Sequence, residues 1–161
     1  MHATSKVTSA TRRARAAGVV MVALLAGALL VSPVPASATA PKIVLTPSQS
    51  AAKIALNRDR KVHGLRLLVS RADAQAKAQA WAERLAKDGY LHHSRLTDGI
   101  GGHACRISEN VGNSNYPTGT IPWIEGAFML SPIHRKNLLD PTVNSVGVGV
   151  ATGGGYTYVV Q

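Results

Sequence analysis

The chain has 161 residues, which is enough for one domain, or for one domain preceded by a targeting segment. Its net charge of +10 does not indicate nucleic-acid binding, because no basic stretch is interleaved with aromatic residues that could stack on bases. Cys105 is the only cysteine, which excludes a disulfide within the chain.

The first 38 residues have the order of a secretory signal. Basic residues at positions 6 to 15 precede an apolar run over 16–34, and a tripeptide of small residues follows over 36–38. This order predicts cleavage after Ala38. The apolar run also reaches the minimum length of a membrane-spanning helix, about 17 residues. The prolines at its end and the cleavage tripeptide favour removal over a membrane anchor.

The mature protein is then expected to be extracellular and to run over 39–161, which is 161 residues less the 38 of the signal, or 123. That length can build one modest core. Residues 39–46 predict a short lead-in, and a single domain is expected over 47–161. Four of the 18 basic residues lie in the signal and all eight acidic residues lie outside it, so the mature net charge is +6. Such a charge suits an anionic cell envelope surface, or serves only solubility.

The first helix is predicted over 47–63. Thr46 supplies a hydroxyl cap, a proline occupies the first turn and Gln49 can reach back, which is the pattern of a capping box. Gly64 is the stop signal. Helical spacing relates Ala51, Ile54, Ala55, Arg58 and Val62, which supports the helix.

The run over 65–69 predicts a short strand or an extended link. A second helix is predicted between Ser70 as its cap and Gly89 as its stop, with Asp73 in its first turn. Its apolar face contains Ala74, Ala78, Trp81 and Leu85. We therefore expect this helix to pack through one stripe.

Residues 90–120 lack a helical period and are rich in glycine, asparagine and histidine, which is typical of a surface segment that carries binding groups. A third helix is predicted with Thr120 as its cap. Ser131-Pro132 then restarts a helix that runs through Leu139 and ends at Asp140-Pro141.

Valines alternate with glycines over 146–150, which predicts a strand, and three glycines over 153–155 predict a tight turn. A returning strand is predicted over 156–161. The glycine face of the first strand predicts that another element packs unusually close to it. Helices followed by an antiparallel hairpin indicate an α+β fold in which helices cover a small sheet.

Histidines, a carboxylate and a thiol form the main group of candidate binding residues: His92, His93, His103, His134, Glu109 and Cys105. These are the ligand types of zinc-like sites. Neither an HExxH motif nor a CxxC pair is present, so spacing alone assigns no site. Each histidine could equally be a polar surface residue, and Glu109 could cap backbone amides. Cys105 could be a small buried residue, an intermolecular link, or a reactive or metal-binding thiol.

Four motifs in order resemble the bacterial branch of the CAP superfamily. These are the proteins named after cysteine-rich secretory proteins, antigen 5 and pathogenesis-related 1, also called SCP domains. The motifs are GYLHHS at 89–94, SENV at 108–111, AFMLSPIHRKNLL at 127–139 and VGVGVA at 146–151. The resemblance runs from Ile54 to Gln161, which is almost the whole predicted mature chain.

The resemblance implies an α-β-α sandwich, in which a small antiparallel sheet lies between helical layers. It also implies a cleft where His93, Glu109 and His134 come together, in some relatives around a divalent metal such as zinc. Two histidines and one carboxylate would leave the fourth position of the metal open for water. The chain departs from many relatives where Phe128 replaces a tryptophan and Ser131 stands in place of a second glutamate.

Three functions are expected from these residues and from the resemblance. The first is a secreted, monomeric binding module with a divalent-metal site and a small apolar ligand, either a lipid or a sterol. The alternative is a metal-assisted hydrolase of peptide or ester bonds at the cell envelope, with Glu109 as general base. The third is adhesion of the basic mature surface to the anionic envelope.

Overall fold

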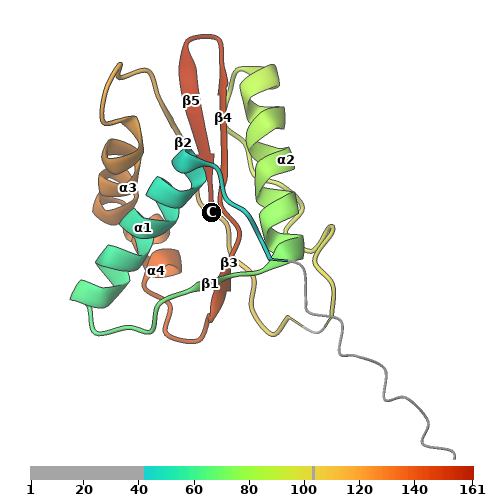
Figure 1. The fold of residues 1–161 in the computed structure, drawn as a ribbon, viewed down its shortest axis with the longest axis vertical. Helices are drawn as coiled ribbons and strands as arrows, with labels where there is room; N and C mark the ends of the chain where they lie inside the picture. Colours follow the sequence, from blue (N-terminus) through green and yellow to red (C-terminus); the bar gives the residue numbers. More distant parts are fainter. Residues whose placement is uncertain (1–41, 103) are drawn as a thin grey trace, which may run out of the picture. The chain divides into compact units, whose positions relative to one another are not determined.

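A computed structural model describes residues 42–102 and 104–161 (Figure 1). The predicted signal segment, its cleavage site and His103 lie outside the described residues. Within them the elements are α1 (Pro47–Val62), β1 (Val69–Ser70), α2 (Ala72–Asp88), β2 (Val111–Ser114), α3 (Thr120–Leu130), α4 (Pro132–Leu138), β3 (Ser145–Val146), β4 (Gly149–Gly153) and β5 (Tyr156–Val160). In this part of the chain, every helix is too short or too polar to cross a membrane.

The central feature is an antiparallel sheet of order β2-β5-β4 between two helical layers (Figure 1). α2 packs on one face, and α1, α3 and α4 lie on the other. Strand alternation sends Val159 towards the second layer, whereas Tyr158 and Val160 point towards α2. The α+β class and the α-β-α sandwich are thus confirmed. A parallel pair, β1-β3, adds a second small sheet in which Ser70 is in register with Val146.

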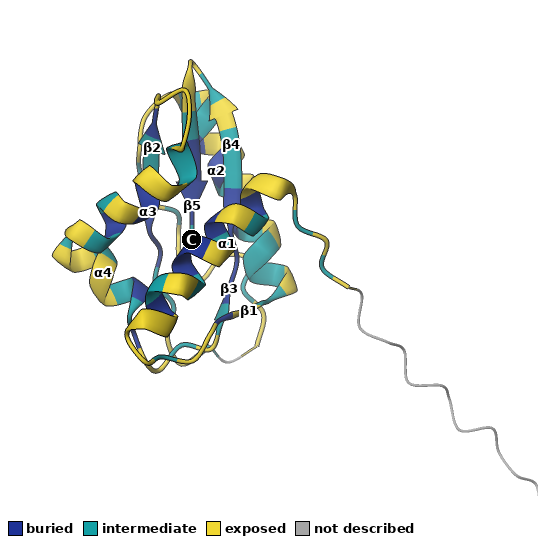
Figure 2. Ribbon diagram, turned by 60° about the vertical axis from the view of Figure 1, so that its left-hand side comes forward, coloured by how far each residue is buried: buried dark blue, intermediate teal, exposed yellow. Residues whose placement is uncertain are grey.

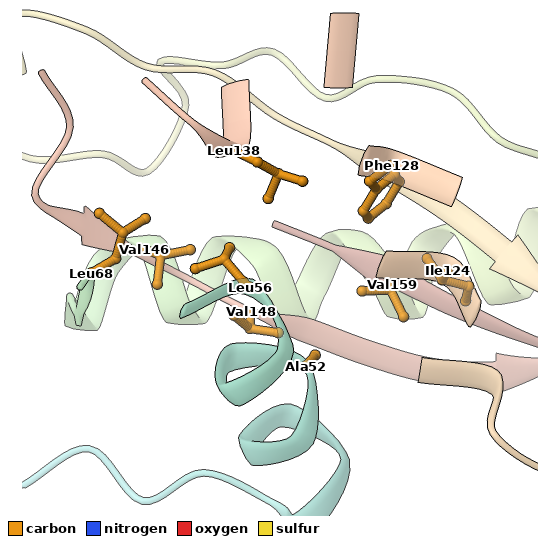
Figure 3. Close-up of a cluster of buried hydrophobic side chains, with 9 residues drawn as sticks. All are labelled: Ala52, Leu56, Leu68, Ile124, Phe128, Leu138, Val146, Val148 and Val159. Atoms are coloured by element: carbon orange, nitrogen blue, oxygen red, sulfur yellow. The ribbon is translucent and has the colours of Figure 1, made fainter. Parts of the chain in front are cut away.

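Each face of the central sheet has its own hydrophobic core. The core beneath α1, α3 and α4 (Figure 3) consists of Ala52, Leu56, Leu68, Ile124, Phe128, Leu138, Val146, Val148 and Val159. The core beneath α2 consists of Ala78, Ala82, Leu85, Val111, Tyr158 and Val160. Both cores lie within the compact unit over 40–161, so this unit contains the packing that its own fold requires.

The predicted start of α1 is confirmed, whereas Ala55 is the single buried member of the five residues at helical spacing. Thr46 Oγ1 accepts from Gln49 N at 3.2 Å, and Gln49 Oε1 accepts from Thr46 N at 2.8 Å, which completes the capping box. Ile54 and Val62 are nevertheless exposed. The buried residues of the helix are Gln49, Ala52, Ala55, Leu56 and Arg60.

Arg60 lies on this buried face beside the core residues Ala52 and Leu56. Its side chain is fully buried, and its guanidinium donates to the carbonyl oxygens of Arg66, Leu138 and Asp140 at 2.9, 2.6 and 3.0 Å. These contacts join α1 to the end of α4. Because α4 lies far along the chain, a helical pattern that is local to α1 contains no sign of them.

The predicted cap of α2 is also wrong. Ser70 pairs in β1, where its hydroxyl accepts from Lys53 Nζ at 2.8 Å, and the N-cap position belongs to Arg71. Asp73 in the first turn accepts from Ala74 N at 2.7 Å. The predicted stop is confirmed, because Gly89 has a φ of 80°.

α3 starts at Thr120, and its N-cap is Gly119 in the left-handed region with a φ of 67°. The Thr120 hydroxyl donates to Tyr116 O at 2.6 Å instead of capping the helix, which corrects the prediction. Ser131 ends α3 and begins α4, as predicted.

The valine and glycine run forms two strands where one was predicted. β3 ends at Val146 and β4 begins at Gly149, because the backbone of Val148 turns to a side chain of α2. Gln75 Oε1 accepts from Val148 N at 3.0 Å, and Gln75 Nε2 donates to Val148 O at 2.7 Å. Gln79 forms the same pair of bonds with Val150, so α2 covers the outer edge of β4.

The close approach predicted at the glycines is confirmed. A Cβ on Gly147 would overlap the backbone carbonyl of Ala74, and a Cβ on Gly149 would overlap that of Ala78. The predicted hairpin is present as well. Its turn is limited to Gly154 and Gly155, with φ values of 57° and 81°, because Gly153 still pairs in β4.

Candidate functional site

Glu109 precedes β2 and its carboxylate joins two distant segments. The residue is 8% exposed. Glu109 Oε1 accepts from Ser94 N at 2.9 Å and lies 2.8 Å from His93 Nδ1, and Oε2 accepts from Ser94 Oγ at 2.6 Å. The carboxylate therefore fixes the segment that follows α2 against the start of β2.

His93 is held through one ring nitrogen only. A carboxylate accepts hydrogen bonds, so Nδ1 donates to Glu109 and, in the neutral ring, Nε2 keeps its lone pair. The His93 side chain is 58% exposed although its carboxylate partner is buried. This geometry presents an oriented imidazole at the protein surface.

His134 lies in the first turn of α4, where its ring centroid is 5.1 Å from that of Phe128. Burial, and then the charge of nearby His93, lowers the pKa of His134. The ring is therefore neutral at pH 7 and can offer a lone pair. The structure thus brings all three predicted residues to one region: His93 hydrogen-bonds to Glu109, and Asn110, the residue after Glu109, donates to the backbone oxygen of His134.

Two asparagines connect this region to α4 through hydrogen bonds. Asn110 Nδ2 donates to His134 O at 3.1 Å, and Asn137 Nδ2 donates to Asn110 Oδ1 at 3.0 Å. These residues and Ser94 were not predicted to have a role. All three belong to the motifs that carry the family resemblance, which was the available signal.

The other candidates lie apart from this region or outside the described residues. His92 Nε2 is 3.1 Å from Asp88 Oδ2, and the ring packs edge-on against Trp81. Cys105 is exposed, so its interpretation as a small buried residue is wrong. His103 is not among the described residues.

A three-ligand metal site does not fit the geometry of the described residues. Among them no group of three or more histidine, cysteine, aspartate or glutamate side chains is arranged to hold a metal ion. Glu109 uses both oxygens to hold Ser94 and His93. The two imidazoles are the donors that this arrangement leaves available.

A pocket of about 130 Å³ borders the same segment. Glu109 and Asn110 line it, but neither His93 nor His134 does. Its apolar walls include Leu68, Leu96, Ile100, Ile107 and Val146. The volume is below the roughly 300–1,000 Å³ of common small-molecule sites.

Comparison with known proteins gives a family match and several similar folds. The model of the family described as "CAP: Cysteine-rich secretory protein family" matches residues 54–161. That range includes the whole region around His93, Glu109 and His134. A comparison with curated proteins finds no match.

The solved structures that resemble the chain include two bacterial proteins. An outer surface protein from Borrelia burgdorferi aligns with a TM-score of 0.57 and 14% identity, over 74% of this chain and 95% of that protein. An extracellular protein containing a SCP domain from Bacillus anthracis aligns with a TM-score of 0.51 and 20% identity, over 74% of this chain and 44% of that one. At these identities the likeness shows a shared fold.

Proposed function

The chain belongs to the CAP family of cysteine-rich secretory proteins, and we propose that it is an extracellular binding domain that takes a divalent metal such as zinc on His93 and His134. An extracellular location is supported by the secretory order of residues 1–38. It is also supported by the two similar structures, which are an outer surface protein and an extracellular protein.

The observation that carries the proposal is the hydrogen bond between His93 and Glu109. Histidines that bind metals usually donate their other ring N–H to a carboxylate or carbonyl, which fixes the ring and its tautomer. Glu109 holds Nδ1 in this way and leaves Nε2 for a ligand. His134 adds a second neutral imidazole, which is the protonation state that a metal requires.

The same geometry does not favour a role for Glu109 as the general base of a hydrolase. A general base must reach the proton of the attacking water, directly or through one further water. Glu109 is buried and accepts three hydrogen bonds from His93 and Ser94. We therefore assign it a positioning role, and we favour binding over hydrolysis.

Zinc titration by calorimetry tests this function on the unit from Thr39 to Gln161. We expect saturable binding of one ion, and its loss in both His93→Ala and His134→Ala, because each variant removes one of two donors. Glu109→Gln is expected to weaken binding by about 10–100-fold through loss of the charged hydrogen-bond partner.

His92→Ala is the matched control, because His92 is the neighbour of His93 and its ring bonds to Asp88. Its affinity should equal that of the unchanged protein. If the folded protein fails to bind zinc, or if either of the two alanine variants binds it normally, the proposed function is wrong.

A further inference from the structure

The outward face of α3 is apolar and uncharged. Within α3 the single ionisable residue is Glu125, which is buried. Trp123 and Leu130 are seven positions apart and so share one face of the helix, with Gly126 between them. All three are exposed, and Leu130 is 87% exposed. α3 therefore presents apolar side chains to solvent where a surface helix ordinarily presents charges.

A further exposed apolar side chain lies at the start of α4. Ile133 is 74% exposed, and it follows Leu130 across the corner formed by Ser131 and Pro132. Figure 2 shows exposed residues along α4 at the outer edge of the domain. At the other end, Tyr116 packs against Trp123 with ring centroids 5.0 Å apart. We call the set of Tyr116, Trp123, Leu130 and Ile133 the α3–α4 patch.

The border of the patch is basic. Leu130, Arg135 and Lys136 line one shallow depression together with Arg106. Arg135 and Lys136 are exposed. Among the described residues that line the depression, the only acidic one is Asp140, which is buried and forms an ion pair with Arg106. The exposed charges at this edge of the patch are therefore positive.

We infer that the α3–α4 patch docks the protein on the surface of a bilayer that contains anionic phospholipids. Leu130 and Ile133 would enter the interfacial region, while Arg135 and Lys136 contact headgroup phosphates. Trp123 suits the same depth, because indole is enriched at the boundary between lipid and water. This inference is independent of the metal proposed on His93 and His134.

Two other binding partners would match fewer features of the patch. A soluble polyanion would bind Arg135 and Lys136 and leave Leu130 and Ile133 in water. A second copy of the chain, related by a twofold axis, would bring the basic border of the patch close to its own copy. A bilayer with anionic headgroups satisfies the apolar and the basic parts at once.

Co-sedimentation with vesicles tests the inference on the unit from Thr39 to Gln161, which lacks the apolar signal segment. We expect binding to mixed phosphatidylcholine and phosphatidylglycerol vesicles, and much weaker binding to phosphatidylcholine alone. Leu130→Ser and Ile133→Ser should each lower the partition coefficient by about tenfold, since each removes one buried aliphatic side chain. Arg135→Gln and Lys136→Gln should each lower it by about fivefold.

Matched controls lie on the α2 side of the sheet. Tyr90→Ser removes an exposed apolar side chain, and Lys87→Gln and Arg95→Gln remove exposed charges. All three should bind vesicles like the unchanged protein. Circular dichroism melts of every variant establish that the fold is retained.

Two results would overturn the inference. One is a pair of opposite outcomes in two double variants: vesicle binding persists when Leu130→Ser and Ile133→Ser are combined, but disappears when Arg135→Gln and Lys136→Gln are combined. This result would identify a purely electrostatic site for polyanions. The other is absence of vesicle binding together with a concentration-dependent dimer in sedimentation velocity that Leu130→Ser abolishes, which would identify a second copy as the occupant.

Discussion

Gly149→Ala is expected to lower the free energy of unfolding by about 3 kcal/mol or more, or to prevent folding. An added Cβ would overlap the carbonyl group of Ala78 and lie 2.7 Å from Gln79 N. These are backbone atoms of α2, so no side-chain rotation relieves the clash. α2 would have to move away from β4, and the two hydrogen bonds between Gln79 and Val150 would be lost.

Urea unfolding followed by circular dichroism measures this effect. Gly126→Ala is the control, because Gly126 lies in the middle of α3 with open space around its Cα. That change should leave stability equal or raise it by up to about 1 kcal/mol, since alanine is the better helix former. A Gly149→Ala variant as stable as the unchanged protein would contradict the close packing of α2 on β4.

The second large effect concerns Glu125, which lies on the buried side of α3 and is 2% exposed. Its Oε2 accepts from Gln161 Nε2 at 2.6 Å, whereas Glu125 Oε1 and Gln161 Oε1 have no hydrogen-bond partner among the described residues. Burial raises the pKa of Glu125 to about 7; the Gln161 hydrogen bond opposes this rise and the charge of Asp59 adds to it. A protonated Glu125 also has an O–H to donate, which the carboxylate lacks.

Stability is therefore expected to fall as the pH rises. The pKa of Glu125 is higher in the folded protein than the 4.5 of an unperturbed glutamate. The contribution of protonated Glu125 to the free energy of unfolding is therefore complete below pH 4.5 and is lost as the pH rises through about 7. The loss amounts to about 3 kcal/mol. Glu125→Gln cannot ionise and should remove this part of the pH dependence.

Urea unfolding of both proteins at several pH values between 4.5 and 8 makes the comparison. Because other titrating groups are common to both chains, the difference between the two curves isolates Glu125. If the free energy of unfolding has the same pH dependence in both proteins, Glu125 ionises in the folded protein at little cost in free energy. That result would contradict the burial of Glu125 with one oxygen unpaired.

Several local signals in the sequence predicted local structure correctly, although the cap predicted at Thr120 was wrong. The capping box at Thr46 and Gln49, the stop at Gly89 and the turn at Gly154 and Gly155 each depend on neighbours within a few residues. Ser70 was assigned wrongly because its pairing with Val146 spans most of the domain. The buried face of α1 was missed for the same reason, since it depends on the distant partners of Arg60.

The region of the candidate site was reached through family motifs rather than through physical pattern. The motifs selected His93, Glu109 and His134, and the structure links His93 to Glu109, and His134 to the neighbouring Asn110, by hydrogen bonds. They did not distinguish a ligand from a positioning residue. That distinction depends on Ser94, whose amide and hydroxyl both bind the Glu109 carboxylate across an irregular segment. Glu125 was missed because nothing in the helical pattern separates a buried acid from a surface one.

The central claim is that Glu109 orients His93 so that Nε2 faces the ligand, and nitrogen NMR of the histidine rings tests it most directly. Long-range proton–nitrogen spectra of the unit from Thr39 to Gln161 should show neutral His93 protonated at Nδ1, and zinc should shift its Nε2 resonance together with one nitrogen of His134. A His93 ring protonated at Nε2, or a zinc-induced shift at His93 Nδ1 instead, would contradict the claim.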